Sequence, residues 1–492
     1  MDILLTHSYF LRFDPKELEA MMPYPPLGTL YAASVLRNAH FTVAIHDSMF
    51  QESEGSIRSS LRIHQPKVFV IYDDQFNYLT KMCLGRMREA AFRMAQIAKE
   101  FGCTVVVFSS DASDHLEKYF NHNVDFVILG EAEQTLRELC EMLLRNPTVL
   151  VSSIPGIAYH SEKGTTKTDP RAIEQNLDQF PFPAWDLIHL EEYQTRWKKK
   201  HGYWSMNLVT TRGCPFHCNW CAKPIYGQVY HSRSPRNVVD EMLLLFKQYR
   251  PDHLWFADDI FGLKPGWLED FAKEIGASKI AIPFKCLSRA DLIVNDDTAR
   301  NLKTSGCETV WIGAESGSQK ILDAMEKGTT LAQIRDATTK LRSLGIKVGY
   351  FLQFGYPGET NQDISQTLKM VKQNMPDEIG VSISYPLPGT KFYERVKSQL
   401  GEKHNWLESG DLEMMFQGSY SPDYYRALHK VTHKKFSVWR GVRTLQKLLN
   451  RPVQFEKHTI RYIVSMFVNA MSLPIATREL QNLSRPVSTH HA

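Results

Sequence analysis

The stretch TTRGCPFHCNWCA, residues 210–222, places three cysteines within eight residues. They are Cys214, Cys218 and Cys221, in the spacing C-x-x-x-C-x-x-C. The stretch starts at the end of an expected strand, NLVTT, and leads into a helical pattern. The loop therefore carries three candidate thiolate ligands and lies where a strand gives way to a helix.

The same strand pattern recurs along residues 205–400. Six apolar stretches follow one another at roughly 30-residue spacing with helical segments between them, and each ends in polar residues: NLVTT, HLWFADD, PFKCLSR, TVWIGAESG, VGYFLQFGYPGET and GVSISYPLPGT. This pattern predicts a partial (β/α)6 barrel of the TIM type, whose chemistry takes place at the carboxyl ends of the strands.

Residues 1–150 have a second β/α pattern. The expected strands are 3–5, 43–46, 68–72, 104–108 and 126–129, and helical segments include 27–37, 79–101 and 133–144. The alternation predicts an α/β domain with a Rossmann-like parallel sheet covered on both faces, and a ligand site at the strand carboxyl ends. Residues 151–204, rich in proline and turn formers, are expected to be a connector that wraps instead of forming a core.

Composition limits the class of protein. The chain has 492 residues, 43% hydrophobic and 23% charged, which is typical of a globular protein of about three domains. The start, MDILLTHSYF, has no basic run or cleavage site, and no stretch of about 18 apolar residues is evident. Eight cysteines are too few for a disulfide scaffold, so we expect a cytoplasmic protein with free thiols.

Charge is distributed unevenly. The net charge is +4, but residues 424–492 contain twelve Lys or Arg and two Glu, a net of 12 − 2 = +10, which leaves 4 − 10 = −6 for the rest. Residues 401–492 are thus expected to form a basic helical region. We favour a helix packed over the open side of the barrel, and the alternative is a helix that makes peripheral contact with a membrane.

Three chemistries could use the cysteine loop. A structural zinc site needs a fourth ligand, for which His217 or His231 would serve. A disulfide leaves one thiol over. Three thiolates on one loop also suit three corners of a 4Fe-4S cluster whose fourth iron stays open to a small ligand, and this interpretation is favoured. The other five cysteines lie at long, irregular spacing and are expected to pack in cores.

On these features the chain resembles a radical S-adenosylmethionine (SAM) enzyme, whose signature is this three-cysteine loop on a partial barrel. The resemblance implies that Trp220, the aromatic residue before the last cysteine, lies against the adenine, and that the open iron chelates SAM. The stretches PPLGTLYAASVLR and VDFVILGEAEQTL resemble the subgroup with an N-terminal cobalamin-binding domain. A separate second cysteine triad, which a methylthiotransferase would carry, is not seen.

The resemblance extends to the ends of the later strands. It implies that SAM or the substrate contacts Asp258 and Asp259 in FADDIF, Ser288 and Arg289 after the third strand, and Glu315 in IGAESG. Acidic groups can accept hydrogen bonds from an ammonium, and a guanidinium can bind a carboxylate through two hydrogen bonds. The alternatives are a helix cap or solvated turn for the aspartates and a surface position for the arginine.

A cobalamin site is implied at the strand ends of the N-terminal domain. The candidate residues share positions in the resembling motifs: Pro26, Gly28, Ser109, Ser110, Gly130 and Glu131. The histidine motif Asp-x-His-x-x-Gly is absent from the sequence, and Ser109-Ser110 replaces the Gly-Gly pair of relatives. The alternative is a sheet kept as a scaffold or substrate platform.

The function implied by the resemblance is reductive cleavage of SAM to a 5′-deoxyadenosyl radical, with a 4Fe-4S cluster, SAM and cobalamin as cofactors. The radical would take a hydrogen from an unactivated carbon of a small molecule or lipid, and methylcobalamin would supply a methyl group. Partners would be that substrate and an external one-electron donor such as flavodoxin or ferredoxin, with no nucleic acid. The alternatives are a radical cyclase or rearrangement enzyme, and a non-enzymatic iron-sulfur redox sensor or electron carrier.

Overall fold

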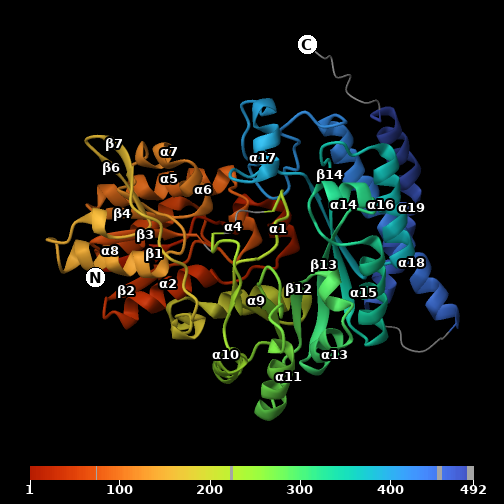
Figure 1. Ribbon diagram of the computed structural model, residues 1–492, viewed down its shortest axis with the longest axis horizontal. Coiled ribbons are helices and arrows are strands. Elements are labelled where there is room, and N and C mark those ends of the chain that lie inside the picture. Colours follow the sequence, from red (N-terminus) through yellow and green to blue (C-terminus); the bar gives the residue numbers. More distant parts are fainter. Residues whose placement is uncertain (74, 222–224, 451–456, 485–492) are drawn as a thin grey trace. The chain divides into compact units, whose positions relative to one another are not determined.

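The computed structural model describes residues 1–73, 75–221, 225–450 and 457–484, which form two compact units (Figure 1). The first unit contains Met1–Pro215, Ala222–Phe284 and Asn405–Asp411. The second contains Phe216–Cys221, Lys285–His404 and Leu412–Ala492. The chain therefore passes from the first unit to the second within the cysteine loop.

The N-terminal sheet has the strand order β2-β1-β3-β4-β5-β6-β7. Its strands are β1 (Ile3–Thr6), β2 (Val43–His46), β3 (Val68–Tyr72), β4 (Thr104–Phe108), β5 (Phe126–Ile128), β6 (Ile157–Ser161) and β7 (Gly164–Lys167). The pairs from β2 to β5 are parallel, which confirms the predicted sheet. The expected connector differs, because β6 and β7 add to this sheet as antiparallel strands and Ile157 is fully buried in its core.

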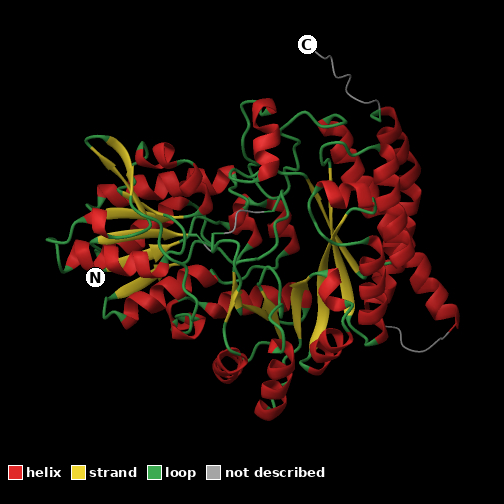
Figure 2. Cartoon of the chain, viewed as in Figure 1, coloured by secondary structure: helices red, strands yellow, loops and turns green. Residues whose placement is uncertain are grey.

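Helices cover both faces of this sheet (Figure 2). The helices of the first unit are α1 (Pro15–Ala20), α2 (Leu27–Asn38), α3 (Ile57–His64), α4 (Tyr78–Lys81), α5 (Gly85–Glu100), α6 (Ser110–Asp114), α7 (Leu116–Phe120), α8 (Glu133–Leu144), α9 (Leu190–His201), α10 (Pro235–Gln248) and α11 (Trp267–Ser278). One buried cluster includes Leu36 and Leu136, from α2 and α8, and the other includes Leu61 and Met94, from α3 and α5. The expected single helix 79–101 is divided, because Cys83 has a left-handed backbone (φ 54°) and Leu84 is extended.

The strands of the second sheet lie in chain order, β8-β11-β12-β13-β14-β15. Its strands are β8 (Ser205–Leu208), β11 (His253–Phe256), β12 (Phe284–Ser288), β13 (Cys307–Glu315), β14 (Lys347–Phe354) and β15 (Glu378–Ile383). The pairs β8·β11, β13·β14 and β14·β15 are parallel. All six predicted strands are present in the predicted order, so the partial barrel is confirmed.

The helices of the second unit are α12 (Ala290–Ile293), α13 (Asp296–Thr304), α14 (Gln319–Ala324), α15 (Leu331–Ser343), α16 (Asn361–Asn374), α17 (Lys391–Val396), α18 (Pro422–Asn450) and α19 (Lys457–Asn482). Helix α18 contacts α16 and the edge strand β15, so one helix of the basic region does cover an open flank of the sheet. Helix α19 packs on α18.

Part of α19 is long and apolar enough to cross a membrane. The segment Thr459–Asn482 contains an 18-residue window with a mean hydropathy of 1.3, and 17% of that window is buried. The sequence analysis found no such stretch because Ser465, Asn469 and Ser472 interrupt the apolar residues at helical spacing. In the helix, this spacing places the polar residues on one face and the apolar residues on another.

A buried carboxyl group follows β14. Glu359 is fully buried, and its Oε2 accepts a hydrogen bond from the Gly355 backbone at 2.6 Å. Burial raises the pKa of Glu359 to about 8, although the Gly355 bond opposes this shift. Burial, and then negative charge on Glu359, raise the pKa of Tyr425, near the start of α18. Glu359 is therefore mostly protonated near neutral pH.

This protonation links stability to pH. The unfolded chain releases the Glu359 proton near 4.5, whereas the folded protein keeps it up to about 8. The stabilising contribution is therefore complete below about 4.5 and is lost as the pH rises to about 8, by at most about 1.4 kcal/mol per pH unit. We expect Glu359→Gln to flatten the fall in the free energy of unfolding between these pH values, measured by denaturant titration. The exposed Glu308→Gln should leave the profile unchanged, and parallel profiles for all three proteins would contradict the assignment.

Candidate active site

The cysteine loop begins with a glycine that cannot be replaced without strain. Strand β9 (Thr211–Arg212) precedes the loop and pairs with β10 (His231–Ser232) after it. Gly213 has φ 80°, and a Cβ there would collide with the carbonyl oxygen of Val229. The chain can therefore turn away from β9 only with glycine before Cys214.

The three thiols are accessible. Cys214 and Cys218 are half-buried and Cys221 is exposed, whereas the other five cysteines are buried, as predicted. None of the eight cysteines forms a disulfide. Among residues 1–73, 75–221, 225–450 and 457–484, no group of three Cys, His, Asp or Glu side chains is already gathered around one point. Solvent-accessible thiols suit iron-sulfur ligation, and the assignment of these three as ligands stays a prediction.

Asn219 fixes the middle of the loop to the second unit. Its side-chain amide donates to the Ala324 carbonyl at 2.8 Å, and its side-chain oxygen accepts a hydrogen bond from the Tyr356 hydroxyl at 2.9 Å. Its backbone nitrogen donates to Met325, and its backbone oxygen accepts from the Phe392 nitrogen. The side chain and backbone of Asn219 thus hold the loop against residues that follow β13, β14 and β15.

Charged side chains surround the aromatic residues of the loop. The Arg289 guanidinium, after β12, lies 3.6 Å from the centre of the Phe216 ring and donates to the Lys327 carbonyl oxygen. The Lys327 ammonium lies 5.8 Å from the Trp220 ring centre and 2.9 Å from Oε1 of Glu315, the last residue of β13. Trp220 Nε1 is buried and has no hydrogen-bond partner among the described residues. These groups offer two cations, one carboxylate and a spare indole donor.

Lys327 was missed by the sequence analysis. Burial alone would lower the pKa of this ammonium, but Glu315 and then Cys218 attract it, and the net effect raises the pKa. Lys327 stands twelve positions after Glu315 and beyond α14. It could not be named by looking for functional residues at the ends of strands. Glu315 itself has φ 52°, a backbone conformation that non-glycine residues rarely adopt and that recurs at functional sites.

The two aspartates of FADDIF have different surroundings. Asp258 is buried and accepts four hydrogen bonds of 2.7–2.8 Å, from the backbone and hydroxyl groups of Thr210 and Thr211. Burial nevertheless raises the pKa of Asp258 to about 6. Asp259 is half exposed and pairs with Lys81 at 2.7 Å. Asp258 thus fixes the chain just before the cysteine loop, and a ligand role for either residue stays a prediction, as does that of buried Ser288.

In the first unit, Arg212 joins the chain before the cysteines to the N-terminal sheet. Its guanidinium, 3% exposed, pairs with Glu131 and lies 2.7 Å from Glu133, both after β5. The Phe180 ring lies 4.3 Å from the guanidinium carbon. Although burial works against the charge, Glu133, Tyr226 and Glu131 hold the pKa of Arg212 above its ordinary value. Glu131, an expected cobalamin contact, has both carboxylate oxygens engaged, the second by the Glu174 backbone.

The other expected cobalamin residues lie at the carboxyl ends of parallel strands or at the start of α2. Ser109 Oγ caps α6, and Ser110 Oγ lies 3.0 Å from Gln75 Oε1. Gly130 has φ 73° and open space where a Cβ would stand, so a ligand could approach its backbone. Pro26 and Gly28 open α2. Their location fits a ligand site of this sheet type, and cobalamin binding by these residues stays a prediction.

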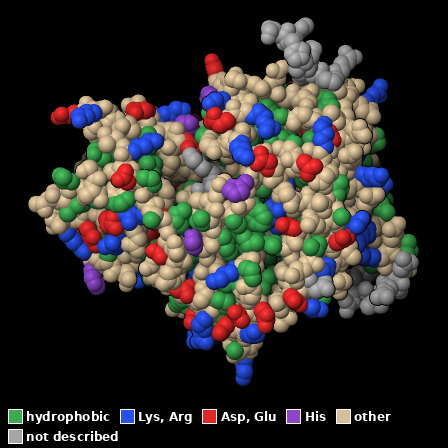
Figure 3. All heavy atoms as spheres, in the orientation of Figure 1, with side chains coloured by type: hydrophobic (Ala, Val, Ile, Leu, Met, Phe, Trp, Pro, Cys, Tyr) green, Lys and Arg blue, Asp and Glu red, His purple; other side chains and the backbone are tan. Residues whose placement is uncertain are grey.

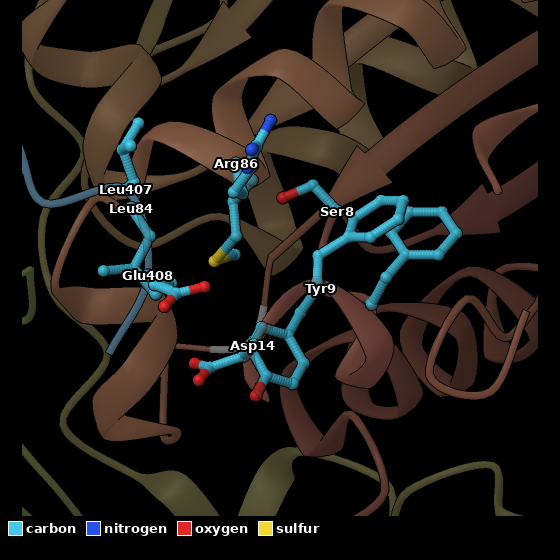
Figure 4. Close-up of a pocket in the computed structure, with 10 residues that line it drawn as sticks. Ser8, Tyr9, Asp14, Leu84, Arg86, Leu407 and Glu408 are labelled. Carbon is cyan, nitrogen blue, oxygen red and sulfur yellow. The ribbon is translucent and has the colours of Figure 1, made fainter. Parts of the chain in front are cut away.

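The sequence analysis also missed polar residues at the switch between β1 and β3. Ser8 donates from its backbone and hydroxyl to Asp73, and burial raises the pKa of Asp73 to about 6. His7 Nε2 lies 2.9 Å from Asp47, so this ring nitrogen already has a partner. A nearby cavity of about 10 Å³, next to Ser8 and Tyr9 (Figure 4), has room for one water. It is too small for a cofactor.

Comparison with known proteins defines the class. Residues 208–371 match the sequence model of the Radical SAM superfamily, which covers the cysteine loop, Glu315 and Lys327. The chain thus contains a radical SAM domain at residues 208–371, and it is an enzyme. Members of this superfamily use a 4Fe-4S cluster and SAM, and the residues above fit both groups.

Relatives resemble the chain beyond this domain. An uncharacterized methyltransferase of Pyrococcus horikoshii is 28% identical over 389 residues, which cover 78% of this chain and 81% of the relative. An anaerobic magnesium-protoporphyrin IX monomethyl ester cyclase of Synechocystis is 26% identical over 371 residues, 75% of this chain and 72% of the relative.

Solved structures share the fold. The radical SAM methyltransferase TsrM from Kitasatospora setae, with cobalamin and a 4Fe-4S cluster bound, has a TM-score of 0.66 at 18% identity, covering 81% of this chain and 75% of TsrM. The cobalamin-dependent SAM radical enzyme OxsB, with aqua-cobalamin bound, has a TM-score of 0.72 at 16% identity, covering 98% of this chain and 77% of OxsB. The predicted architecture is thus confirmed.

The contacts of Asn219 predict its importance for the loop. We expect Asn219→Ala to remove the hydrogen bonds that tie the loop to the Ala324 carbonyl and the Tyr356 hydroxyl, which keep their bond to each other, and to lower iron retained per chain after anaerobic reconstitution severalfold. Tyr356→Phe removes one of these contacts and should have a smaller effect. Iron content and the visible absorption of the cluster measure both. Full iron retention in Asn219→Ala would show that the loop does not depend on this side chain.

Proposed function

We propose that this protein is a cobalamin-dependent radical SAM methyltransferase that acts on an unactivated carbon of a small molecule or lipid. The observation that carries the proposal is the arrangement of Arg289, Lys327 and Glu315 beside the aromatic residues of the cysteine loop. A redox sensor or electron carrier needs the cysteines but has no use for this charged group. The loop therefore serves a bound substrate.

The chain's own residues would bind and orient the cluster and SAM. Cys214, Cys218 and Cys221 would hold the cluster. The Arg289 and Lys327 cations suit the carboxylate of SAM, and Glu315 suits its ammonium or hydroxyl groups. Trp220 would lie against the adenine. When bound, the reduced cluster supplies the electron that cleaves SAM, and cobalamin supplies a transferable methyl group.

The proposal of methyl transfer has two supports. A relative that is named as a methyltransferase aligns with 78% of this chain, and two structures with bound cobalamin share the fold of this chain. Pro26, Gly28, Ser109, Ser110 and Gly130 would contact cobalamin at the strand ends, whereas Glu131 would act through Arg212. A radical cyclase is the second candidate, because a cyclase is also among the relatives.

The partners follow from the chemistry. Radical SAM catalysis needs an external one-electron donor, such as flavodoxin or ferredoxin, and the reducing cytoplasm suits both the donor and the free thiols. Residues 424–492 of the basic C-terminal region, with their net charge of +10, would make peripheral contact with anionic membrane lipid.

The cluster assignment predicts a clear division among the cysteines. Changing Cys214, Cys218 or Cys221 to Ala should abolish the brown chromophore and the formation of 5′-deoxyadenosine under reducing, anaerobic conditions. The buried Cys83→Ala and Cys307→Ala variants should keep both. A triple Ala variant that still cleaves SAM reductively would refute the proposal.

Cobalamin dependence is tested separately. After reconstitution with hydroxocobalamin and desalting, we expect about one cobalt per chain. A bulky residue at Ser109, such as Ser109→Trp, should reduce cobalt but not iron. A product that has gained one carbon identifies methyl transfer, whereas a product of unchanged carbon count identifies the cyclase. An enzyme that retains no cobalt would show that the N-terminal sheet is a scaffold.

A further inference from the structure

Helix α19 packs with its polar face inward. Lys434 of α18 donates to Ser472 at 2.6 Å, the Ser437 and Ser465 hydroxyls lie 2.8 Å apart, and Asn469 donates to Ser437. Met466 contributes an apolar contact and would meet a Cβ placed at Gly441. The helix is thus held to α18 largely by hydrogen bonds, which reverses the usual arrangement of a surface helix.

The opposite face of α19 is an apolar stripe open to solvent. Its members recur at helical spacing on one side and are 55–75% exposed: Ile460, Val464, Phe467, Val468, Met471 and Ile475. On α18, Val442 and Leu449 are also exposed, Leu449 by 84%. A soluble monomer rarely leaves such a continuous apolar surface uncovered.

Charge indicates what covers the stripe. Exposed Arg461 and Arg478 lie near its two ends, within a region that carries twelve basic and two acidic residues. Figure 3 shows Lys and Arg side chains on the side where Figure 1 draws α18 and α19. A second copy docking stripe to stripe would bring two regions of +10 together, which repel. An anionic lipid surface matches both the apolar stripe and the charge.

The packing also decides between lying on the membrane and crossing it. Helices α18 and α19 are antiparallel, since Lys434 meets Ser472 while the Arg440 guanidinium lies 4.0 Å from the Tyr462 ring centre. A spanning α19 would bring the basic residues of α18 into the hydrocarbon, which is costly. An in-plane helix inserts only its stripe.

We propose that the α19 stripe inserts into one leaflet of an anionic membrane, with α19 parallel to the surface. This inference deepens the peripheral lipid contact of the proposed function and does not depend on the chemistry proposed there. Membrane binding therefore requires the stripe as well as the basic charge.

Vesicle sedimentation of the full chain tests the proposal. We expect binding to phosphatidylcholine vesicles that contain phosphatidylglycerol and weak binding to phosphatidylcholine alone. The stripe variant Val464→Ser/Phe467→Ser/Met471→Ser should bind at least about tenfold more weakly. The control variant Ile63→Ser/Val149→Ser/Leu150→Ser, which removes exposed apolar residues elsewhere, should bind like the wild type. Arg461→Gln/Arg478→Gln should weaken binding only to the anionic vesicles.

Other outcomes overturn the proposal. If the wild-type protein stays in the supernatant with both vesicle types, the α19 stripe does not bind membranes. A dimer in analytical ultracentrifugation that the stripe variant abolishes, without vesicle binding, would assign the stripe to a second copy. SAM cleavage without vesicles is measured in parallel, because failure of the proposed function would abolish cleavage while leaving vesicle binding intact.

Discussion

The contribution of the first unit to the site depends on one constraint, which is the burial of the Arg212 guanidinium. Arg212 has no water to solvate its charge, so Glu131, Glu133 and the Phe180 ring must do so. Removing one member of such a buried pair typically costs about 3–5 kcal/mol, because the remaining charge is left unpaired. The strand that delivers Gly213 and Cys214 is thereby tied to the turn after β5. The N-terminal domain is thus part of the support of the cysteine loop.

The second unit supports the rest of the loop by different means. Neutral hydrogen bonds to Asn219 fix its backbone and side chain, and cation–π contacts place Arg289 and Lys327 beside Phe216 and Trp220. Each contact is modest, but together they define the positions of aromatic and charged groups around one loop. The cysteines themselves are left accessible.

Periodicity predicted the fold well because burial of parallel strands requires continuous apolar runs, and all six barrel strands are found where those runs are. It failed where local backbone geometry decides, as at Cys83, whose left-handed conformation divides the expected helix. The same holds for the site. Arg289 and Glu315 could be named because they end strands, whereas Lys327, Asn219 and Asp73 acquire partners only through tertiary contacts. The charge of the basic region could be counted from the sequence. The exposure of the α19 stripe could not be predicted, because it depends on which face of α19 packs against α18.

The chain-ordered pairing of β8 to β15 has a consequence for synthesis on the ribosome. The strands can join the sheet one after another as they emerge, with the cysteines arriving after the first. The contacts of Asn219, however, come 105 and 137 residues later, at Ala324 and Tyr356. During translation the three thiols are therefore exposed on a loop that has none of its later supports, and they can react with oxidants or stray metals. The cysteine loop is therefore secured only after most of the polypeptide has been made.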